Sequence, residues 1–233
     1  MENLQALLQK CPVLSGLPAE GIIEAASFAR VRHFDAKEII YSKGDAHSAL
    51  LVIAKGAVRI NSVSSLGKEV SLMILESYSW FGDNVFSPGT PRVFGATAHT
   101  DATLIELPGD KFRQLLGKYP ESYPLVLDLL SRRLWAAMSV MEDDALRGID
   151  ARIARRLLLL AEHQHNAVDC AEQCVVRVTR EQLANMMGLT RQSVHKVLKK
   201  LEKLGVISLQ YGYIRILSSS GIKAQLKKLE QEC

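Results

Sequence analysis

The chain has 233 residues, 48% of them hydrophobic and 23% charged, which is an ordinary composition for a globular protein with room for two cores. Its unbroken apolar stretches are far too short to cross a bilayer. The first residues show neither the basic nor the apolar part of a signal peptide. Four scattered cysteines do not make a disulfide framework at this length, so we expect the protein in the reducing cytoplasm.

Charge is distributed unevenly along the chain. Residues 1–147 carry 15 Lys and Arg against 17 Asp and Glu, whereas residues 148–233 carry 14 against 8. A basic block of this kind suits a polyanionic partner such as nucleic acid. Charge alone is weak support, but it directs attention to the C-terminal third.

The first half of the chain is expected to be a short helical entry followed by strands. Apolar residues keep helical spacing on either side of a break at Gly16 to Pro18. From Glu38 onward, short apolar runs alternate with glycines, a pattern typical of an antiparallel roll or barrel. The expected strands are Ile39–Tyr41, Leu50–Ile53, Val58–Ile60, Val70–Ile74, Thr97–Ala98 and Thr103–Leu107.

A long helix is predicted from about Pro124 to Arg147. Its apolar residues recur at alternating spacings of three and four, the 3.5-residue period of a coiled-coil seam. Packing of this helix on its own domain is the alternative, but the register favours a homodimer, with the seam ending at Asp144. The seam residues are Leu127, Leu130, Leu134, Ala137 and Met141.

Residues 176–203 carry the pattern of a helix-turn-helix. After a second helix (149 to about 163) and a polar loop (165–173), a strand is expected at 176–178. Thr179 followed by Gln182 has capping-box spacing and predicts a helix that Gly188 ends. Thr190 then caps a second helix, whose apolar stripe is Val194, Val197, Leu198 and Leu201.

The opposite stripe of that second helix is expected to bind DNA. It holds Arg191, Gln192, His195, Lys196 and Lys199. Arg and Gln in the first turn have the geometry to bond guanine and adenine edges in the major groove. A solvated basic helix without a ligand is the alternative, which the agreement of caps, turn and stripe disfavours. A hairpin turning near Gly212 would form a wing.

Residues 178–207, VTREQLANMMGLTRQSVHKVLKKLEKLGVI, resemble the winged helix of the cyclic AMP receptor protein and FNR family. The resemblance extends over essentially the whole chain and implies an α+β fold: an N-terminal β-roll, a dimerisation helix and a winged helix. It implies domains at 1–122, 123–147 and 148–233. The cyclic AMP receptor protein has Glu at the position of Gln192, so a different operator is expected. The DNA-binding residues are predicted to be Thr179, Thr190, Arg191, Gln192, Ser193 and Lys196.

The same resemblance identifies an effector cassette in the roll. Gly82 would let the backbone approach a phosphate, Arg92 would neutralise the phosphate charge, and Asp83 would accept a hydrogen bond from a ribose hydroxyl. The family normally has Gly-Glu where this chain has Gly82-Asp83, and a small residue in place of Val93. The Thr-Ser pair used against adenine is Ala137-Met138 here. The predicted effector residues are Gly82, Asp83, Asn84, Arg92, Val93, Ala137 and Met138, with cyclic AMP the leading candidate effector.

Alternatives to a cyclic-nucleotide-gated regulator follow from these departures. One is a regulator of the same fold with a vestigial pocket or a non-nucleotide effector. An enzyme is excluded by the absence of a nucleophile-elbow sequence and of room for a catalytic domain. No metal is expected, because the spacing of His163, His165, Cys170 and Cys174 matches no common zinc pattern and Cys11 alone cannot hold an iron–sulfur cluster. The expected partners are a pseudo-palindromic DNA duplex, a second copy of the chain and RNA polymerase.

Overall fold

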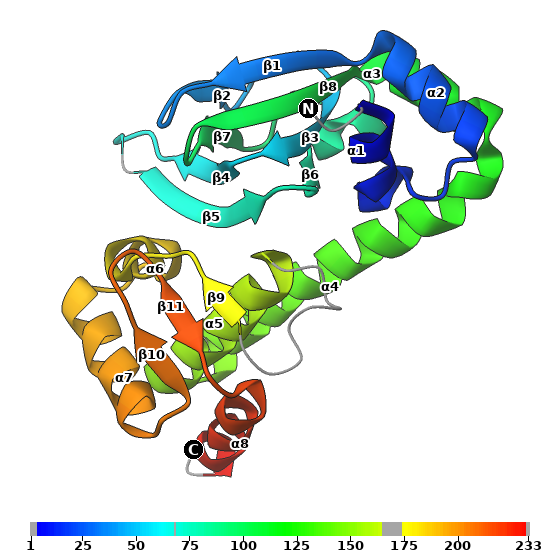
Figure 1. Ribbon diagram of the computed structural model, residues 1–233. Coiled ribbons are helices and arrows are strands. Elements are labelled where there is room, and N and C mark those ends of the chain that lie inside the picture. The colour runs from blue at the N-terminus through cyan, green and yellow to red at the C-terminus, as the bar shows by residue number, and fades with distance from the viewer. Residues whose placement is uncertain (1–3, 68, 165–173, 232–233) are drawn as a thin grey trace. The chain divides into compact units, whose positions relative to one another are not determined.

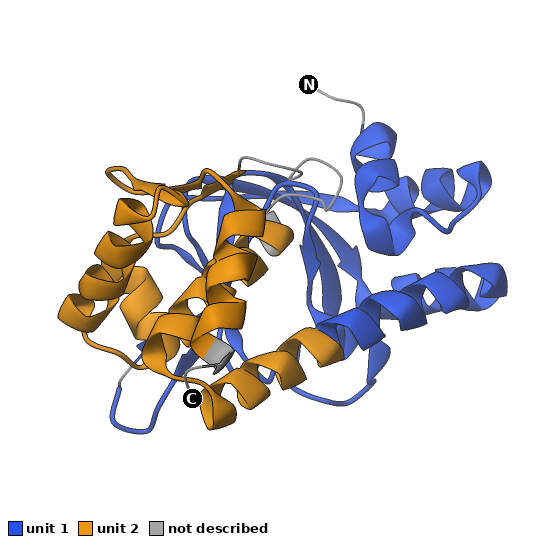
Figure 2. Ribbon diagram, turned by 90° about the horizontal axis from the view of Figure 1, so that it is seen from below, with its two compact units in different colours: residues 1–133 blue, residues 134–233 orange. Residues whose placement is uncertain are grey.

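The computed structural model describes residues 4–67, 69–164 and 174–231, which form two compact units. The first unit comprises residues 1–133 and the second residues 134–233, and the boundary lies within one long helix (Figure 2). Figure 1 gives the order of the helices and strands. No helix among the described residues is long and apolar enough to cross a membrane.

The first unit is built on an antiparallel roll of two four-stranded sheets. One sheet has the strand order β1-β8-β3-β6 and the other β2-β7-β4-β5. All neighbouring strands in both sheets are antiparallel. The strands are β1 (Arg30–Phe34), β2 (Ile39–Tyr41), β3 (Ala49–Lys55), β4 (Ala57–Val63), β5 (Glu69–Glu76), β6 (Trp80–Phe81), β7 (Gly95–Ala98) and β8 (Ala102–Pro108).

Strand β3 is buried on both faces, which explains its continuous apolar sequence. Because successive side chains of a strand point to opposite faces, Leu51 and Ile53 enter the core between the two sheets. Leu50 and Val52 enter a second core, under the helices. Two cores therefore share one strand.

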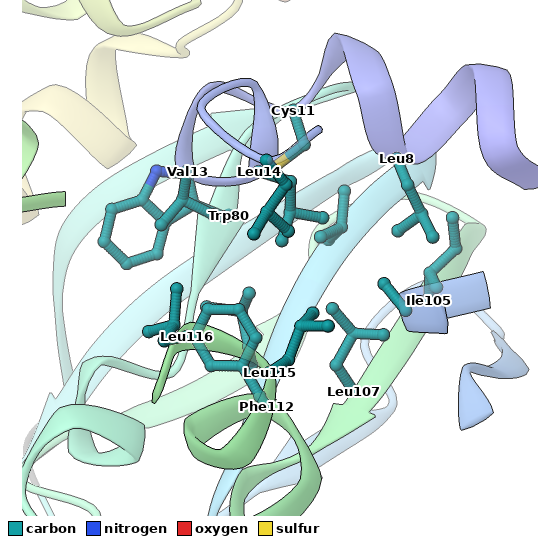
Figure 3. Close-up of a cluster of buried hydrophobic side chains, with 14 of the residues drawn as sticks. Leu8, Cys11, Val13, Leu14, Trp80, Ile105, Leu107, Phe112, Leu115 and Leu116 are labelled. Atoms are coloured by element: carbon teal, nitrogen blue, oxygen red, sulfur yellow. The ribbon is translucent and has the colours of Figure 1, made fainter. Parts of the chain in front are cut away.

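The second core of this unit lies between one face of the roll and the N-terminal helices (Figure 3). Leu8, Leu14, Trp80 and Phe112 are among its buried side chains. The rings of Phe112 and Phe86 meet edge to face at 5.9 Å. Its helical residues come from α1 (Leu4–Lys10), η1 (Pro12–Leu14), α2 (Ala19–Phe28), η2 (Asp83–Phe86), α3 (Gly109–Lys118) and the start of the long helix that follows η3 (Pro120–Ser122).

Helix α4 (Tyr123–Leu146) begins in the first unit and ends in the second. Its bounds agree with the predicted helix within one residue at each end. Several large apolar side chains along it are exposed in the single chain. They are Leu127, Leu134, Trp135, Met138 and Met141.

The second unit contains the winged helix-turn-helix. Its three-stranded antiparallel sheet has the order β10-β11-β9. Helix α8 packs against α5 and closes the unit. The elements are α5 (Ile149–Gln164), β9 (Cys174–Val176), α6 (Arg180–Met187), α7 (Arg191–Lys203), β10 (Ile207–Leu209), β11 (Ile214–Ile216) and α8 (Ser219–Gln231).

The strand expected at 176–178 was predicted two residues too far along the chain. Strand β9 pairs with the three-residue β11, and the ladder runs from Cys174 opposite Ile216 to Val176 opposite Ile214. Val178 is buried, but its amide bonds the carbonyl of Val176 in a local turn. The buried Val178 therefore continues the alternating pattern of a strand, although it is not paired in the β9–β11 ladder. The polar loop expected at 165–173 lies outside the described residues.

Candidate DNA-binding surface and effector pocket

Helices α6 and α7 begin at side-chain caps. The Thr179 hydroxyl accepts a hydrogen bond from the Gln182 amide at 3.1 Å, and the Gln182 side chain accepts one from the Thr179 amide at 2.8 Å. Gly188 ends α6 in the left-handed conformation, at a φ of 63°. Thr190 then accepts a bond from the Ser193 amide at 3.1 Å. The predicted caps and turn are confirmed.

Helix α7 has a buried apolar face and an exposed polar face. All four residues of the predicted apolar stripe are buried, and four residues of the opposite stripe, Arg191, Gln192, Lys196 and Lys199, are exposed. Of these, the side chains of Arg191, Gln192 and Lys196 make no hydrogen bond or ion pair with any other residue that the structure describes. By contrast, Lys199 pairs with Glu202 at 2.6 Å. The first two turns of α7 thus present free donors to an external acceptor.

His195 departs from the predicted polar stripe. Its side chain is half-buried, and its Nδ1 atom is buried without a hydrogen-bond partner among the described residues. At helical spacing, His195 lies between the two faces of α7. His195 is therefore not part of the exposed polar face of α7.

Glu202 joins the wing to helix α7. Its carboxylate accepts a bond from the Leu209 amide of β10 at 3.0 Å, as well as from Lys199. Both hydrogen bonds lower the pKa of Glu202, and the bond from Lys199 has the larger effect. The wing turns at Gly212, where the φ is 82°, and carries the fully exposed Tyr211 at its tip. Sequence reasoning missed Glu202, because a long-range bond to a backbone amide leaves no periodic signal.

Gly82 occupies a crowded turn in the first unit, immediately before η2. Its φ is 100°, in the left-handed region that glycine favours. A Cβ at this position would lie 2.3 Å from the carbonyl oxygen of Ala49 and 2.8 Å from Nη1 of Arg92. The turn therefore excludes other residues and brings the backbone against the Arg92 guanidinium.

Arg92 is a buried arginine with unused donors. Its side chain is 3% exposed, and only Nη2 has a hydrogen-bond partner among the described residues, the Ala49 carbonyl at 3.0 Å. Nε and Nη1 are buried without partners in the part of the chain that is described. The guanidinium lies 4.2 Å from the centroid of the Tyr41 ring. Burial lowers the pKa of Arg92 and raises that of Tyr41 to about 12.

These two unused donors fit an anion. An unpaired buried donor costs about 1–3 kcal/mol, and more when the group is charged. A phosphate would satisfy both donors through charge-assisted hydrogen bonds. The residues present therefore suit an anionic group better than a neutral one.

Asp83 already has a partner, which the sequence did not reveal. Its carboxylate forms an ion pair with Arg133 of α4. Arg133 also donates to the carbonyl of Trp80 at 2.6 Å, and its guanidinium lies 3.4 Å from the centroid of the Trp80 ring. A ribose hydroxyl would have to share Asp83 with Arg133. Spacing along α4 gives no sign of this pair, because the partner of Arg133 lies 50 residues earlier in the chain.

The other predicted effector residues differ in their surroundings. The side-chain amide of Asn84 donates to the Thr90 carbonyl at 3.3 Å, whereas its Oδ1 is buried without a partner among the described residues. Val93 is 56% exposed. Ala137 and Met138 lie in the second unit, where both are exposed. The first unit alone thus brings together Gly82, Asp83, Asn84 and Arg92.

Replacing Gly82 by Ala is expected to destabilise the protein by about 2 kcal/mol or more, because left-handed strain adds to the clash with the Ala49 carbonyl. Gly89 is a matched control, since its φ is 81° but no atom lies within 4 Å of a Cβ placed there. Gly89→Ala should cost only about 1 kcal/mol. Urea unfolding followed by circular dichroism measures both. Equal losses would show that the close approach at Gly82 is unimportant.

Two family models match this chain, one in each unit. Residues 31–119 match the family model of the cyclic nucleotide-binding domain, and residues 151–224 match that of the Crp-like helix-turn-helix domain. Among the described residues, no group of His, Cys, Asp or Glu is arranged to hold a metal ion. His165 and Cys170, considered above for such a site, lie outside the described part of the chain.

Three relatives cover most of the chain. The cAMP-activated global transcriptional regulator CRP of Haemophilus influenzae is 28% identical, over 75% of this chain and 78% of its own. The CRP-like cAMP-activated global transcriptional regulator of Mycobacterium tuberculosis is 25% identical, over 89% and 92%. The crystal structure of TTHA1359, a CRP/FNR-family regulator of Thermus thermophilus, is 26% identical, with a TM-score of 0.60 over 87% of this chain and 98% of that chain. With these two matched domains, this chain belongs to the CRP/FNR family of transcription regulators.

Proposed function

We propose that the protein is a homodimeric, sequence-specific regulator whose two α7 helices bind a pseudo-palindromic operator. The observation that carries this proposal is the free polar face of α7. Arg191, Gln192 and Lys196 are exposed and unpaired among the described residues, above a fully buried apolar face. Ser193, Thr179 and Thr190 contribute hydroxyls at the two helix starts. In dimers of this kind the half-sites lie about one helical turn apart.

The exposed seam of α4 supports the dimer. Leu127, Leu134 and Met141 are 61%, 58% and 70% exposed in the single chain. Exposed apolar side chains along a long helix are costly in water and are typical of an interface, whereas Leu130 of the predicted seam is partly buried against the core of the first unit. We propose that a second copy of α4 covers it. In this proposal the domains are the roll (1–122), the dimerisation helix (123–147) and the winged helix (148–233). We propose RNA polymerase as a further partner of the assembled regulator.

Leu134→Glu tests the dimer and its role in DNA binding together. A pair of unpartnered carboxylates in the seam would be strongly unfavourable, so the variant should sediment as a monomer. It should also lose affinity for an operator with two half-sites, because one α7 then binds alone. Leu66→Glu is the matched control, since Leu66 is 94% exposed and lies outside the seam. A monomeric wild type, or a variant that dimerises normally, would contradict the proposal.

For the roll we propose a small anionic effector, with cyclic AMP the leading candidate. The support is the buried Arg92 with two unused donors beside Gly82, together with the cyclic nucleotide-binding model that matches this unit. The H. influenzae and M. tuberculosis relatives are described as cAMP-activated. Binding would shift the population of dimer arrangements toward one that spaces the two α7 helices correctly.

A vestigial pocket or a non-nucleotide effector is the second candidate. The ion pair between Asp83 and Arg133 favours it, because the carboxylate expected to accept a ribose hydroxyl is already engaged. The hydrophobic Ala137-Met138 pair favours it too, since neither side chain is a good partner for a purine amine. DNA affinity that ignores cyclic nucleotides would distinguish this candidate from the first.

A further inference from the structure

A pocket of about 390 Å³ lies entirely within the second unit. Its walls come from the end of α4, from α5, from the last residue of α6 and from α8. A volume of this size is within the range of small-molecule sites. None of its lining residues belongs to the first unit or to the exposed face of α7, so the residues of the two functions proposed above do not form it.

Positive charge exceeds negative charge on the lining of this pocket. Two of its arginines are neutralised locally: Arg155 pairs with Asp143 at 2.7 Å, and Arg152 with Asp144 at 2.6 Å. Arg155 also donates to the Ser139 hydroxyl at 3.0 Å. These contacts hold the side chains of Arg152 and Arg155 in place in the pocket lining.

Three further cations of the lining make no ion pair among the described residues. Arg156 is half-buried, and its side chain has no hydrogen bond or ion pair with another described residue. Burial lowers the pKa of Arg156, although Asp144 and Asp143 raise it. Lys223 and Lys227 lie one turn apart on α8, also without ion-pair partners among the described residues. Glu162 is the remaining acid of the lining, so the cations are in excess.

The rest of the lining is apolar. Val140, Leu158, Leu159, Met187 and Leu226 contribute aliphatic or thioether surface. An inorganic ion would leave this surface in contact with water, whereas an organic anion would cover it. The combination selects a ligand with a charged end and an apolar body.

Helix α8 supplies part of this site. The match to the Crp-like helix-turn-helix model ends at residue 224, inside α8, which continues to Gln231. Leu226 and Lys227 therefore lie beyond the matched segment. Nothing in the matched domain assigns a ligand to this surface.

We propose that the pocket between α4, α5 and α8 binds a small organic anion with a phosphate or carboxylate head. Arg156 and Lys227 bind the head, and the leucines of α5 and α8 contact the apolar body. Because Met187 ends α6 and lines the pocket, the bound anion contacts the helix-turn-helix through α6 and not through the exposed face of α7. The site lies on the DNA-binding unit itself, independent of Arg92.

Phenyl phosphate and benzoate are suitable probes, since they share the apolar ring and differ in the head group. Isothermal titration of the full-length protein should detect binding of at least one. Lys227→Gln should weaken it about threefold, and Arg156→Gln about tenfold, as expected for a lost charged hydrogen bond. Lys228→Gln is the matched control: Lys228 is the next residue on α8, exposed and equally charged, but outside the lining. Each titration is repeated in the Arg92→Met background, so that phosphate bound beside Gly82 in the first unit does not contribute to the measured heat.

Equal weakening by Lys227→Gln and Lys228→Gln would overturn the proposal, because general charge would then explain the binding. So would the absence of heat with both probes at millimolar concentration. Competition by random-sequence duplex DNA, with full displacement of phenyl phosphate, would assign this basic surface to DNA instead. Lys227 is exposed, so its variant tests the site even if Arg156→Gln fails to fold.

Discussion

Replacing Arg92 by Met is expected to abolish detectable binding of cyclic AMP while leaving the stability of the free protein unchanged or increased. The guanidinium is the buried cation beside Gly82, and its loss removes at least about 1.5–3 kcal/mol of charged hydrogen bonding, or more than about tenfold in affinity. In the free protein the same guanidinium is buried with two donors unpaired among the described residues, so an apolar replacement relieves a desolvation cost. Calorimetric titration and urea unfolding measure the two effects.

Arg132→Met provides the control for this prediction. Arg132 is exposed on α4, where it pairs only with Asp128, four residues earlier, among the described residues. Its loss should change neither binding nor stability appreciably. If wild-type protein gives no heat with millimolar cyclic AMP and its DNA affinity does not respond, the vestigial pocket or a different effector replaces the cyclic AMP proposal. That result would leave the DNA-binding surface untouched, because different residues form it.

Arg191→Ala is expected to weaken binding to the cognate operator by about 1–3 kcal/mol and to leave binding to random DNA nearly unchanged. The side chain lies in the first turn of α7, exposed and unpaired among the described residues. A residue that reads a base edge contributes only where that base is present. Fluorescence anisotropy on both duplexes at one fixed salt concentration measures the difference.

Lys199→Ala serves as the control on the same helix. Lys199 is already paired with Glu202, so its loss should alter the affinities for cognate and random DNA alike, and only slightly. Equal losses on both duplexes for Arg191→Ala would remove Arg191 from the residues that read sequence. Gln192 and Lys196 would then be the remaining candidates on the exposed face.

Local rules predicted the helix-turn-helix well. The helix caps and the turn depend on contacts between residues a few positions apart, so short sequence motifs suffice to predict them. They are formed by Thr179 with Gln182, by Gly188 and by Thr190. The apolar stripe of α7 and the bounds of α4 follow from helical periodicity in the same way. Strand β3 was identifiable because burial on both faces gives an unbroken apolar run.

Elements whose residues lack such local signals were missed. Strand β1 has four exposed side chains out of five and pairs only with β8, so its sequence shows no alternation. Helix α8 was absent from the prediction, which ended the chain on the wing. Two buried residues anchor it, Ile222 and Leu226, and its remaining described side chains are polar, small or partly exposed.

Contacts between distant segments account for the rest. The ion pair of Asp83 with Arg133, the ring of Tyr41 under Arg92 and the bond from Leu209 to Glu202 each join residues that have no shared periodicity. Such pairs depend on tertiary packing, which composition and spacing do not encode. They also change the chemistry of the effector pocket, since Asp83 is engaged and Arg92 is not fully satisfied.

Selection of binding sites from a random-sequence duplex library by the wild-type protein tests the central claim most directly. A dimer that reads DNA with two α7 helices should enrich a pseudo-palindrome whose half-sites lie about 10 base pairs apart, centre to centre. The enriched duplex should bind at least about a thousandfold more tightly than random DNA at physiological salt. Selection should be repeated with and without cyclic AMP, because the effector gates affinity in the proposed mechanism. Failure to enrich any sequence under either condition, with the same affinity for every duplex, would contradict the account.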